Sequence, residues 1–201
     1  MIEVTNEDNM ALMARYPDNH FELAIVDPEF GIGIGNSPRL VTDKGLKKKE
    51  WDNKPISMSY FDDLFRVSKN QIIWGGNYYP LPANKHCVIW DKLQPEKLSF
   101  GMFDYAWTSF NGPNKIFRYL VQLEKNKIHI TQKPVKLYEW LLMNYAKKGD
   151  KILDTHLGSG SIAIACHNLG YDLTACELDK EYFEAAMKRL KQHQSQTKLF
   201  L

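Results

Sequence analysis

The sequence has few cysteines, little net charge and no long apolar run. Its three cysteines, Cys87, Cys166 and Cys176, have no C-x-x-C spacing, which excludes a zinc site of that type and a disulfide framework. This sparse, odd count favours reduced thiols and a cytoplasmic location. No apolar run approaches the ~20 residues that cross a bilayer, so we expect no membrane association. The segment MIEVTNEDNM is acidic and polar, unlike a signal peptide.

The formal net charge of only +2 means that affinity for a polyanion must come from local patches. Basic side chains gather in two stretches, 36–57 and 92–127. A run of lysines is most often a solvated surface, but interleaved aromatic residues favour a groove that holds nucleic acid. The candidate nucleic-acid contacts are Arg39, Lys47, Lys48, Lys49 and Arg118.

Hydrophobic residues make up 44% of the 201 positions, which predicts a packed globular chain of one domain, 1–201. Apolar, β-branched runs predict strands at 2–4, 22–26, 71–75, 87–91, 105–110, 151–157 and 172–178. Helical patterns lie between them at 9–16, 59–68, 135–146, 161–169 and 180–193. Alternating strands and helices indicate an α/β sheet with parallel pairs and helices on both faces.

The segment 148–186, which begins KGDKILDTHLGSGS, combines a strand, a glycine turn, a helix and a second strand that ends at Glu177. Gly158 and Gly160 let the backbone approach a ligand where a Cβ would clash. An acidic residue about 20 positions after such a turn suits hydrogen bonds to ribose hydroxyls. The segment therefore predicts a nucleoside-binding βαβ unit, although it carries neither G-x-G-x-x-G nor a P-loop.

Four motifs together resemble one known family. DTHLGSGS resembles the D-P-F-x-G-S-G-T loop that binds S-adenosylmethionine in DNA amino-methyltransferases, and Asp27-Pro28-Glu29-Phe30 resembles their D-P-P-Y catalytic tetrapeptide. HITQKPVKL (129–137) resembles their H-P-T-Q-K-P-x-x-L segment, and 6–28 resembles their acidic lead-in. Their order, with the tetrapeptide first and the cofactor loop last, is that of the permuted beta group.

The resemblance implies a seven-stranded, mostly parallel Rossmann-like sheet with one reversed edge strand. It also implies that the strand at 2–4 pairs with the strand ending at Glu177. It implies S-adenosyl-L-methionine as cofactor and small target-recognition insertions around 36–57 and 92–127. The cofactor-binding residues carried over are Asp8, Asp27, Lys133, Pro134, Asp154, His156, Gly158, Ser159, Gly160, Ser161 and Glu177.

The catalytic residues implied are Asp27, Pro28 and Phe30. The Asp27 carboxylate and the Pro28 carbonyl would accept the hydrogens of an exocyclic amine and stabilise the positive charge that develops on its nitrogen. Phe30 would stack on a base flipped out of double-stranded DNA. An Asp-led tetrapeptide resembles the adenine branch of the family, so we expect adenine as the target.

The chain departs from the family pattern in the tetrapeptide and in the glycine loop. Phe30 stands where members often have tyrosine and keeps the stacking face. Glu29 stands where members usually have proline, Thr155 also replaces a proline, and His156 replaces an aromatic residue near the cofactor. Glu29 loosens the backbone and adds negative charge, whereas His156 is expected to be structural and to transfer no proton. Lys133 is also expected to line the cofactor pocket. Gly75 and Gly76 either let the target base approach closely or form an ordinary turn.

Several alternatives stay open at this point. Glu29 leaves open an impaired relative that binds cofactor and DNA without turnover. Cytosine-amine or RNA methylation is the same chemistry on another target, and a nicotinamide oxidoreductase uses a similar sheet. A homodimer and a partner restriction endonuclease are compatible with the resemblance, and neither the recognition sequence nor the host or phage origin can be read from the sequence.

Overall fold

The computed structural model describes residues 1–37, 47–97, 101–120, 123 and 127–196. The strands are β1 Ile2–Thr5, β2 Phe21–Val26, β3 Ser68–Trp74, β4 Cys87–Asp91, β5 Phe103–Thr108, β6 Lys115–Arg118, β7 Lys151–Asp154 and β8 Asp172–Cys176. The helices are α1 Asn9–Met13, α3 Met58–Val67, α4 Val135–Tyr145, α5 Ser161–Leu169 and α6 Lys180–Gln194, with short 3-10 helices η1 Ile34–Asn36 and η2 Gly76–Tyr78.

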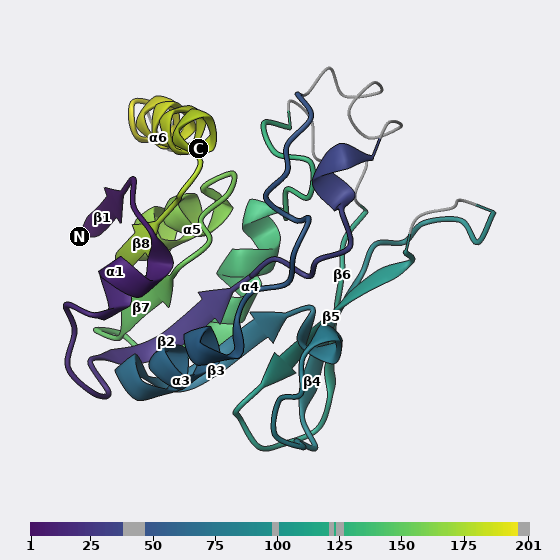
Figure 1. Cartoon of the computed structure of the whole chain (residues 1–201), viewed down its shortest axis with the longest axis horizontal. Coiled ribbons are helices and arrows are strands. Elements are labelled where there is room, and N and C mark those ends of the chain that lie inside the picture. Colours follow the sequence, from purple (N-terminus) through teal and green to yellow (C-terminus); the bar gives the residue numbers. More distant parts are fainter. Residues whose placement is uncertain (38–46, 98–100, 121–122, 124–126, 197–201) are drawn as a thin grey trace, which may run out of the picture.

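The strands form one sheet in the order β1-β8-β7-β2-β3-β5-β4-β6 (Figure 1). The sheet is mostly parallel, as expected, but its described residues form eight strands instead of the expected seven. The expected pairing of β1 with β8 is confirmed, since Ile2 lies opposite Leu173 in a parallel register. The reversed strand, β5, is antiparallel to both β3 and β4 and therefore lies inside the sheet, not at its edge.

The sheet has an apolar core on each face. In β2, Leu23 and Ile25 pack in the cluster that includes residues of α4, α5 and α6, whereas Ala24 and Val26 pack with α1 and α3. Because successive strand residues point to opposite faces, a central strand buried on both sides needs an uninterrupted apolar run. That is why ELAIV was recognisable as a buried strand (Figure 1).

The stretch 92–127, expected as an insertion, contributes to the sheet. Residues of β5 pair with β3 and β4, and β6 pairs with β4 in a parallel register. β6 was not predicted because it is short and its side chains alternate between half-buried and exposed, so it lacks an apolar run.

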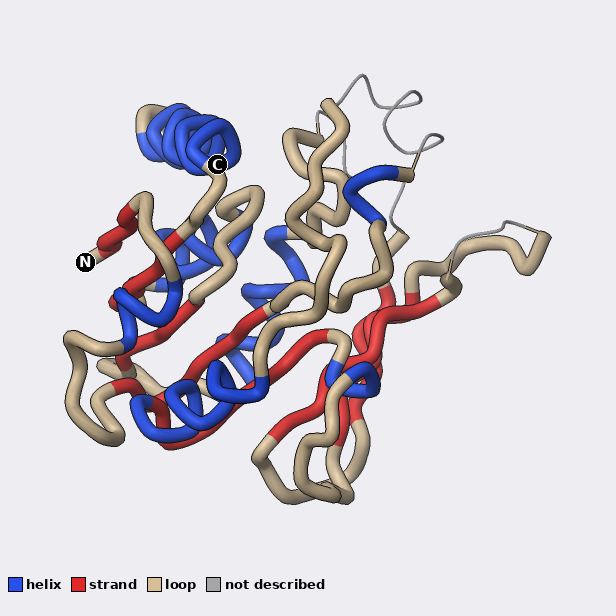
Figure 2. Tube along the Cα trace, in the orientation of Figure 1, coloured by secondary structure: helices blue, strands red, loops and turns tan. Residues whose placement is uncertain are grey.

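Because β7, β2 and β3 are parallel, their carboxyl ends lie at the same end of the strands, and this side of the sheet forms one edge along the strand ends. Figure 2 shows long loops gathered beyond that edge. Open α/β sheets bind ligands at this edge, so the fold places the loops after β2, β7 and β8 where a site is expected. None of the described helices has the length and apolar character to cross a bilayer.

Candidate active site

The loop after β2 carries a half-buried carboxylate, Asp27, with one oxygen paired and one oxygen free. Asp27 Oδ2 forms an ion pair with Lys133 Nζ, whose ammonium also lies 5.1 Å from the centre of the Trp74 ring. Within the described residues, Asp27 Oδ1 is buried and accepts no hydrogen bond. Buried polar atoms are normally satisfied, so an orphan oxygen at a loop edge marks a place for a ligand donor.

The glycine turn after β7 is built around Glu177. The Gly158 N–H donates to Glu177 Oε2 at 2.8 Å, and the Asp179 N–H donates to Oε1 at 2.9 Å. Gly158 and Gly160 have φ of 54° and 71°, a conformation that side chains disfavour. A Cβ on Gly160 would also lie 3.1 Å from the Ala186 Cβ, so this glycine lets α6 pack closely.

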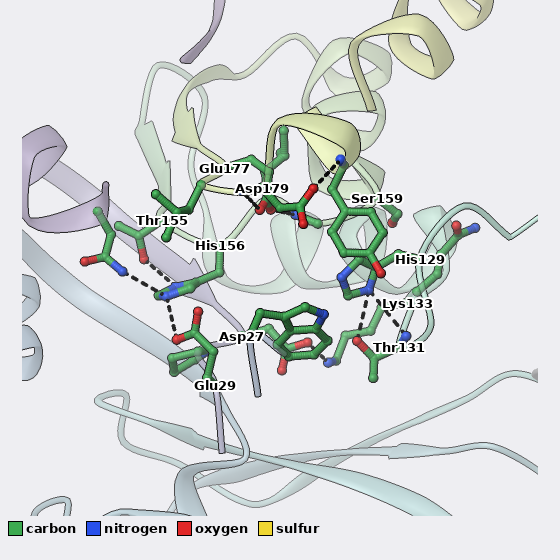
Figure 3. A pocket seen from close by; sticks show the side chains of 18 of the residues that line it. Asp27, Glu29, His129, Thr131, Lys133, Thr155, His156, Ser159, Glu177 and Asp179 are labelled. Carbon is green, nitrogen blue, oxygen red and sulfur yellow. Dashed lines mark hydrogen bonds and ion pairs between the residues drawn. The ribbon is translucent and has the colours of Figure 1, made fainter. Parts of the chain in front are cut away.

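The two loops converge on one cavity of about 260 Å³ (Figure 3). Asp27, Pro28, Glu29 and Phe30 line it from the first loop. Gly158 and Ser159 line it from the glycine turn. The convergence of these segments, which lie far apart in the sequence, is the arrangement that the motif order requires.

Further predicted residues on the cavity wall are Lys133, His156 and Glu177. Other predicted residues lie behind this wall and support it. The Ser161 hydroxyl donates to the Lys133 carbonyl at 2.7 Å, and Pro134 occupies the N-cap of α4.

Asp8 and Asp154 have structural partners. The Asp8 carboxylate caps α1 by accepting the Met10 and Ala11 N–H groups at 2.9 and 3.2 Å. Asp8 does not line the cavity, whereas its neighbours Glu7 and Asn9 do. Asp154 accepts the His156 N–H at 2.9 Å, and burial raises the pKa of Asp154 to about 7. We therefore regard Asp8 as holding the start of α1 and Asp154 as holding the turn after β7.

The carbonyls of Pro28 and Glu29 in the tetrapeptide are held by the Tyr79 hydroxyl. The Tyr79 hydroxyl lies 2.7 Å from the Glu29 carbonyl and 3.3 Å from the Pro28 carbonyl. Burial raises the pKa of Tyr79 far above its usual range, so this hydroxyl stays protonated and donates. A carbonyl oxygen has two lone pairs, so Pro28 retains the capacity to accept a substrate N–H.

Phe30 is packed against its own chain. Its ring stacks on Tyr78 with centroids 4.8 Å apart and an interplanar angle of 11°. A Cβ on Gly75 would lie 2.1 Å from a Phe30 ring carbon, so Gly75 makes room for Phe30 itself. We expected Gly75 to let the target base approach closely. The structure shows instead that Gly75 makes room for the Phe30 ring, on which the base is expected to stack.

Trp51, His129 and Tyr182 form an aromatic wall of the cavity. His129 belongs to the segment 129–137 that resembles the family, whereas Trp51 and Tyr182 were not predicted as cavity residues. The ring centres of Trp51 and His129 are 5.4 Å apart, and those of His129 and Tyr182 are 4.3 Å apart. The lysines beside Trp51 favoured a nucleic-acid groove for this ring, but it lines the cavity instead. The buried Asp52 carboxylate accepts the Gly31 and Ile34 N–H groups, both at 2.9 Å, and so ties this segment to the catalytic loop.

Most candidate nucleic-acid contacts have partners in the protein. Lys49 pairs with Asp179 and Glu181 at 2.7 and 2.8 Å, and Lys47 pairs with Glu181 at 2.7 Å. These pairs fasten the 47–52 segment to the start of α6. Arg118 lies 3.4 Å from Asp91, Lys48 is exposed, and Arg39 lies outside the described residues.

The architecture and the cavity together define a Rossmann-like methyltransferase fold, and solved structures share it. The M1.HpyAVI–SAM complex is 20% identical over 94% of this chain and 99% of its own, with a TM-score of 0.61. TTHA0409 from Thermus thermophilus, complexed with S-adenosyl-L-methionine, is 15% identical over 98% and 96%, with a TM-score of 0.61. The cytosine-N4-specific PvuII DNA methyltransferase is 13% identical over 100% and 88%, with a TM-score of 0.62.

Residues 38–188 match the family described as DNA methylase, and the chain belongs to that family. Among curated relatives, it is 37% identical over 75 residues to the type II methyltransferase M.HpaI of Haemophilus parainfluenzae. It is 40% identical over 62 residues to M2.DpnII of Streptococcus pneumoniae. These matches cover 37% and 31% of this chain but only 24% and 23% of the two relatives.

Proposed function

We propose that the protein is a DNA adenine methyltransferase that moves a methyl group from S-adenosyl-L-methionine to the exocyclic amine of a flipped adenine. The observation that carries this proposal is the single cavity shared by Asp27 and the Gly158–Glu177 turn. Family membership supports methyl transfer to a DNA amine. The tetrapeptide follows β2 and the glycine turn follows the later β7, and this order supports the permuted beta-group arrangement.

The residues of the glycine turn fit the cofactor. Glu177 holds the turn with one backbone N–H on each oxygen and keeps further lone pairs for ribose hydroxyls. The apolar faces of Tyr182 and Leu178 line the same end of the cavity and suit a purine ring. When bound, S-adenosyl-L-methionine supplies an electrophilic methyl carbon on a positively charged sulfonium, which suits a cavity lined by several carboxylates.

The catalytic work falls to Asp27 and Pro28. Asp27 Oδ1 and the Pro28 carbonyl accept the two amine hydrogens, which aims the nitrogen lone pair at the methyl carbon. Lys133 pairs with Asp27 Oδ2, which leaves Oδ1 for the substrate amine. Transfer of the methyl group to the nitrogen would break its bond to sulfur and leave S-adenosylhomocysteine, and the Asp27 carboxylate would take the proton that the methylated nitrogen gives up.

Adenine is favoured over cytosine by the residue that begins the tetrapeptide. Asp27 resembles the adenine branch, whereas cytosine-amine enzymes of this type tend to begin with serine. The fold does not separate the two targets, because the cytosine-N4-specific PvuII enzyme has a similar architecture. The choice of base therefore rests on Asp27 and is a matter for product analysis.

The direct test uses tritiated S-adenosyl-L-methionine and unmethylated double-stranded DNA, followed by nucleoside analysis. We expect label in N6-methyladenine, and binding of S-adenosylhomocysteine by calorimetry. Label in N4-methylcytosine, or in RNA alone, would overturn the assignment of the target. Cofactor binding with no transfer to any nucleic acid would overturn the catalytic proposal and leave a binding protein.

The proposal extends to the oligomeric state and to a partner enzyme. We infer that the protein acts on DNA as a monomer or as a homodimer, as beta-group relatives often do, and that a partner restriction endonuclease fits its type II relatives. Sedimentation at several protein concentrations, with and without duplex DNA, measures the oligomeric state. A nuclease that cuts the same sequence only when it is unmethylated would identify the partner.

A further inference from the structure

Three of the positions that depart from the family pattern, Glu29, Thr155 and His156, form one connected network. His156 Nε2 lies 3.3 Å from Glu29 Oε2, and His156 Nδ1 lies 2.9 Å from Thr155 Oγ1. Thr155 Oγ1 in turn lies 2.6 Å from the Tyr60 hydroxyl. Figure 3 shows His156 between Glu29 and Thr155 at one end of the cavity. Glu29 is therefore far from Thr155 and His156 in the sequence but contacts His156 in space.

We propose that Glu29 and His156 are a mutually dependent positioning pair that fastens the catalytic loop to the glycine turn. A second proline at position 29 would hold the loop by fixing φ, whereas glutamate leaves φ free. The ion pair supplies the missing constraint from outside the loop. The activity consequences of this proposal rest on the proposed function, but the pairing itself does not.

Glu29 is anchored at both its side chain and its main chain. Its carbonyl accepts the Tyr79 hydroxyl at 2.7 Å and the Ile56 N–H at 3.1 Å, while its carboxylate reaches His156. The Pro28 carbonyl, the expected amine acceptor, is on the adjacent residue. Holding Glu29 in place therefore holds the acceptor in place, and a small displacement there is costly for transfer.

The charges of the pair support each other. Burial alone lowers the pKa of His156, but the carboxylates of Glu29, Asp154 and Glu177 outweigh that effect and raise it. Burial alone raises the pKa of Glu29, but the His156 imidazolium outweighs that effect and lowers it. Two further groups contact the His156 ring. Asn9 Nδ2 lies 3.1 Å from His156 Nε2. The Tyr60 ring packs edge-on against it, with ring centres 5.2 Å apart.

Mutual dependence follows from burial. The side chains of His156 and Glu29 are only 11% and 24% exposed. Removing one partner of such a pair leaves the other charge uncompensated, whereas removing both and restoring apolar packing leaves no charge to compensate. The two substitutions should therefore be strongly non-additive.

The experiment is a double-mutant cycle with Glu29→Pro, His156→Phe and the combination of both, and with Glu29→Gln as the conservative variant. His167→Phe and Glu184→Gln are matched controls, because neither side chain lines the cavity and both lie on the outer surface of their helices. The measurements are the NMR titration of the His156 ring, affinity for S-adenosylhomocysteine, and kcat and KM for methyl transfer against pH.

We expect each single variant to lose about tenfold or more in kcat and the double variant to recover to within about threefold of the parent, a coupling typical of contacting residues. Glu29→Gln should lower the pKa of His156 by about one unit or more, and the high-pH limb of the kcat profile should shift with it. Multiplicative losses in the cycle, or an unchanged His156 titration in Glu29→Gln, would overturn the proposal.

The His156 titration needs no methyl transfer, so the two proposals fail separately. A shifted titration in a protein that methylates nothing would overturn the proposed function and retain the pair. An active enzyme whose His156 titration is the same in the parent and in Glu29→Gln would retain the function and overturn the pair. If Glu29→Pro does not fold, Glu29→Gln still carries both the titration and the kinetic comparison.

Discussion

The two corners of the cavity balance their buried carboxylates in different ways. In the catalytic corner, Asp27 pairs with Lys133 and Glu29 pairs with His156. In the glycine-turn corner, Asp154 and Glu177 accept backbone N–H groups, and within the part of the chain that the structure describes neither forms an ion pair. Burial raises the pKa of both. The first corner has side-chain cations of its own, whereas the second gains most from a ligand that brings positive charge.

The largest effect should come from Asp27→Asn, which removes the charged acceptor of the catalytic corner. We expect kcat to fall on the order of 10²–10³-fold, the range for losing one electrostatic contact to a transition state, with affinity for S-adenosylhomocysteine nearly unchanged. Single-turnover methyl transfer and calorimetry measure the two quantities. Asp62→Asn on the exposed face of α3 is the control, and an Asp27→Asn enzyme of full activity would contradict the assignment.

The next effect concerns the cation of the same corner. Lys133→Met leaves the Asp27 carboxylate buried without its partner, and breaking a buried pair in this way costs about 3–5 kcal/mol of unfolding free energy. Urea unfolding measures the loss. Combining Lys133→Met with Asp27→Asn should recover much of it, and equal losses in the single and double variants would show that the pair contributes nothing.

The glycine-turn corner predicts a dependence on pH. Because burial raises the pKa of Asp154 to about 7, the folded chain keeps a proton that the unfolded chain has already lost. Stability therefore falls as the pH rises from about 4 to about 7. Asp154→Asn cannot ionise, so its stability relative to the parent should rise across this window by on the order of 2–4 kcal/mol. A difference that stays constant with pH would contradict the raised pKa.

A smaller effect is expected where Phe30 meets Tyr78. A base that stacks on the Phe30 face covered by Tyr78 has to displace that ring, and aromatic pairs of this kind contribute about 0.5–1.5 kcal/mol. Tyr78→Ala should therefore favour the flipped state by about two- to tenfold, measured as 2-aminopurine fluorescence in a duplex target. Weaker flipping in this variant would mean that Tyr78 supports the base and does not compete with it.

The smallest effect lies outside both corners, in the lysines of the 47–49 segment. Lys48 is exposed, and in the described chain no carboxylate is recorded within ion-pair distance of it, whereas Lys47 pairs with Glu181. Lys48→Ala should reduce the slope of log affinity for DNA against log salt concentration by about 1, and Lys47→Ala should reduce it less. Equal slopes in both variants would remove this distinction.

The sequence predicted the sheet and most of the cavity because those signals are local. Apolar runs such as ELAIV mark strands that are buried on both faces, and glycines followed by a distant acidic residue mark a turn with Glu177 at its centre. Motif order then predicted which loops meet. The observed bounds of β3 and β7 differ by up to a few residues from the predicted ranges 71–75 and 151–157, because the end of a strand depends on where its pairing with neighbouring strands stops.

The rest depended on contacts between distant segments. No local pattern shows that Glu29 meets His156, that Trp51 turns into the cavity, or that Lys49 pairs with Asp179. The charged segment at 47–52 has the composition of a solvated or nucleic-acid-binding surface. Its role in closing the cavity follows only from where Asp52 and Trp51 lie in the fold.

The position of β2 between β3 and β7 also bears on how the chain is made. Of the two strands that pair with β2, β3 is synthesised soon after β2, but β7 is synthesised much later. The partner of β1 is β8, which is the last strand of the sheet to be synthesised. Until β7 is synthesised, β2 presents an apolar, hydrogen-bonding edge, the kind of surface that recruits other nascent chains. Translation must therefore pass the end of β8 before the sheet can close and the two halves of the cavity can meet.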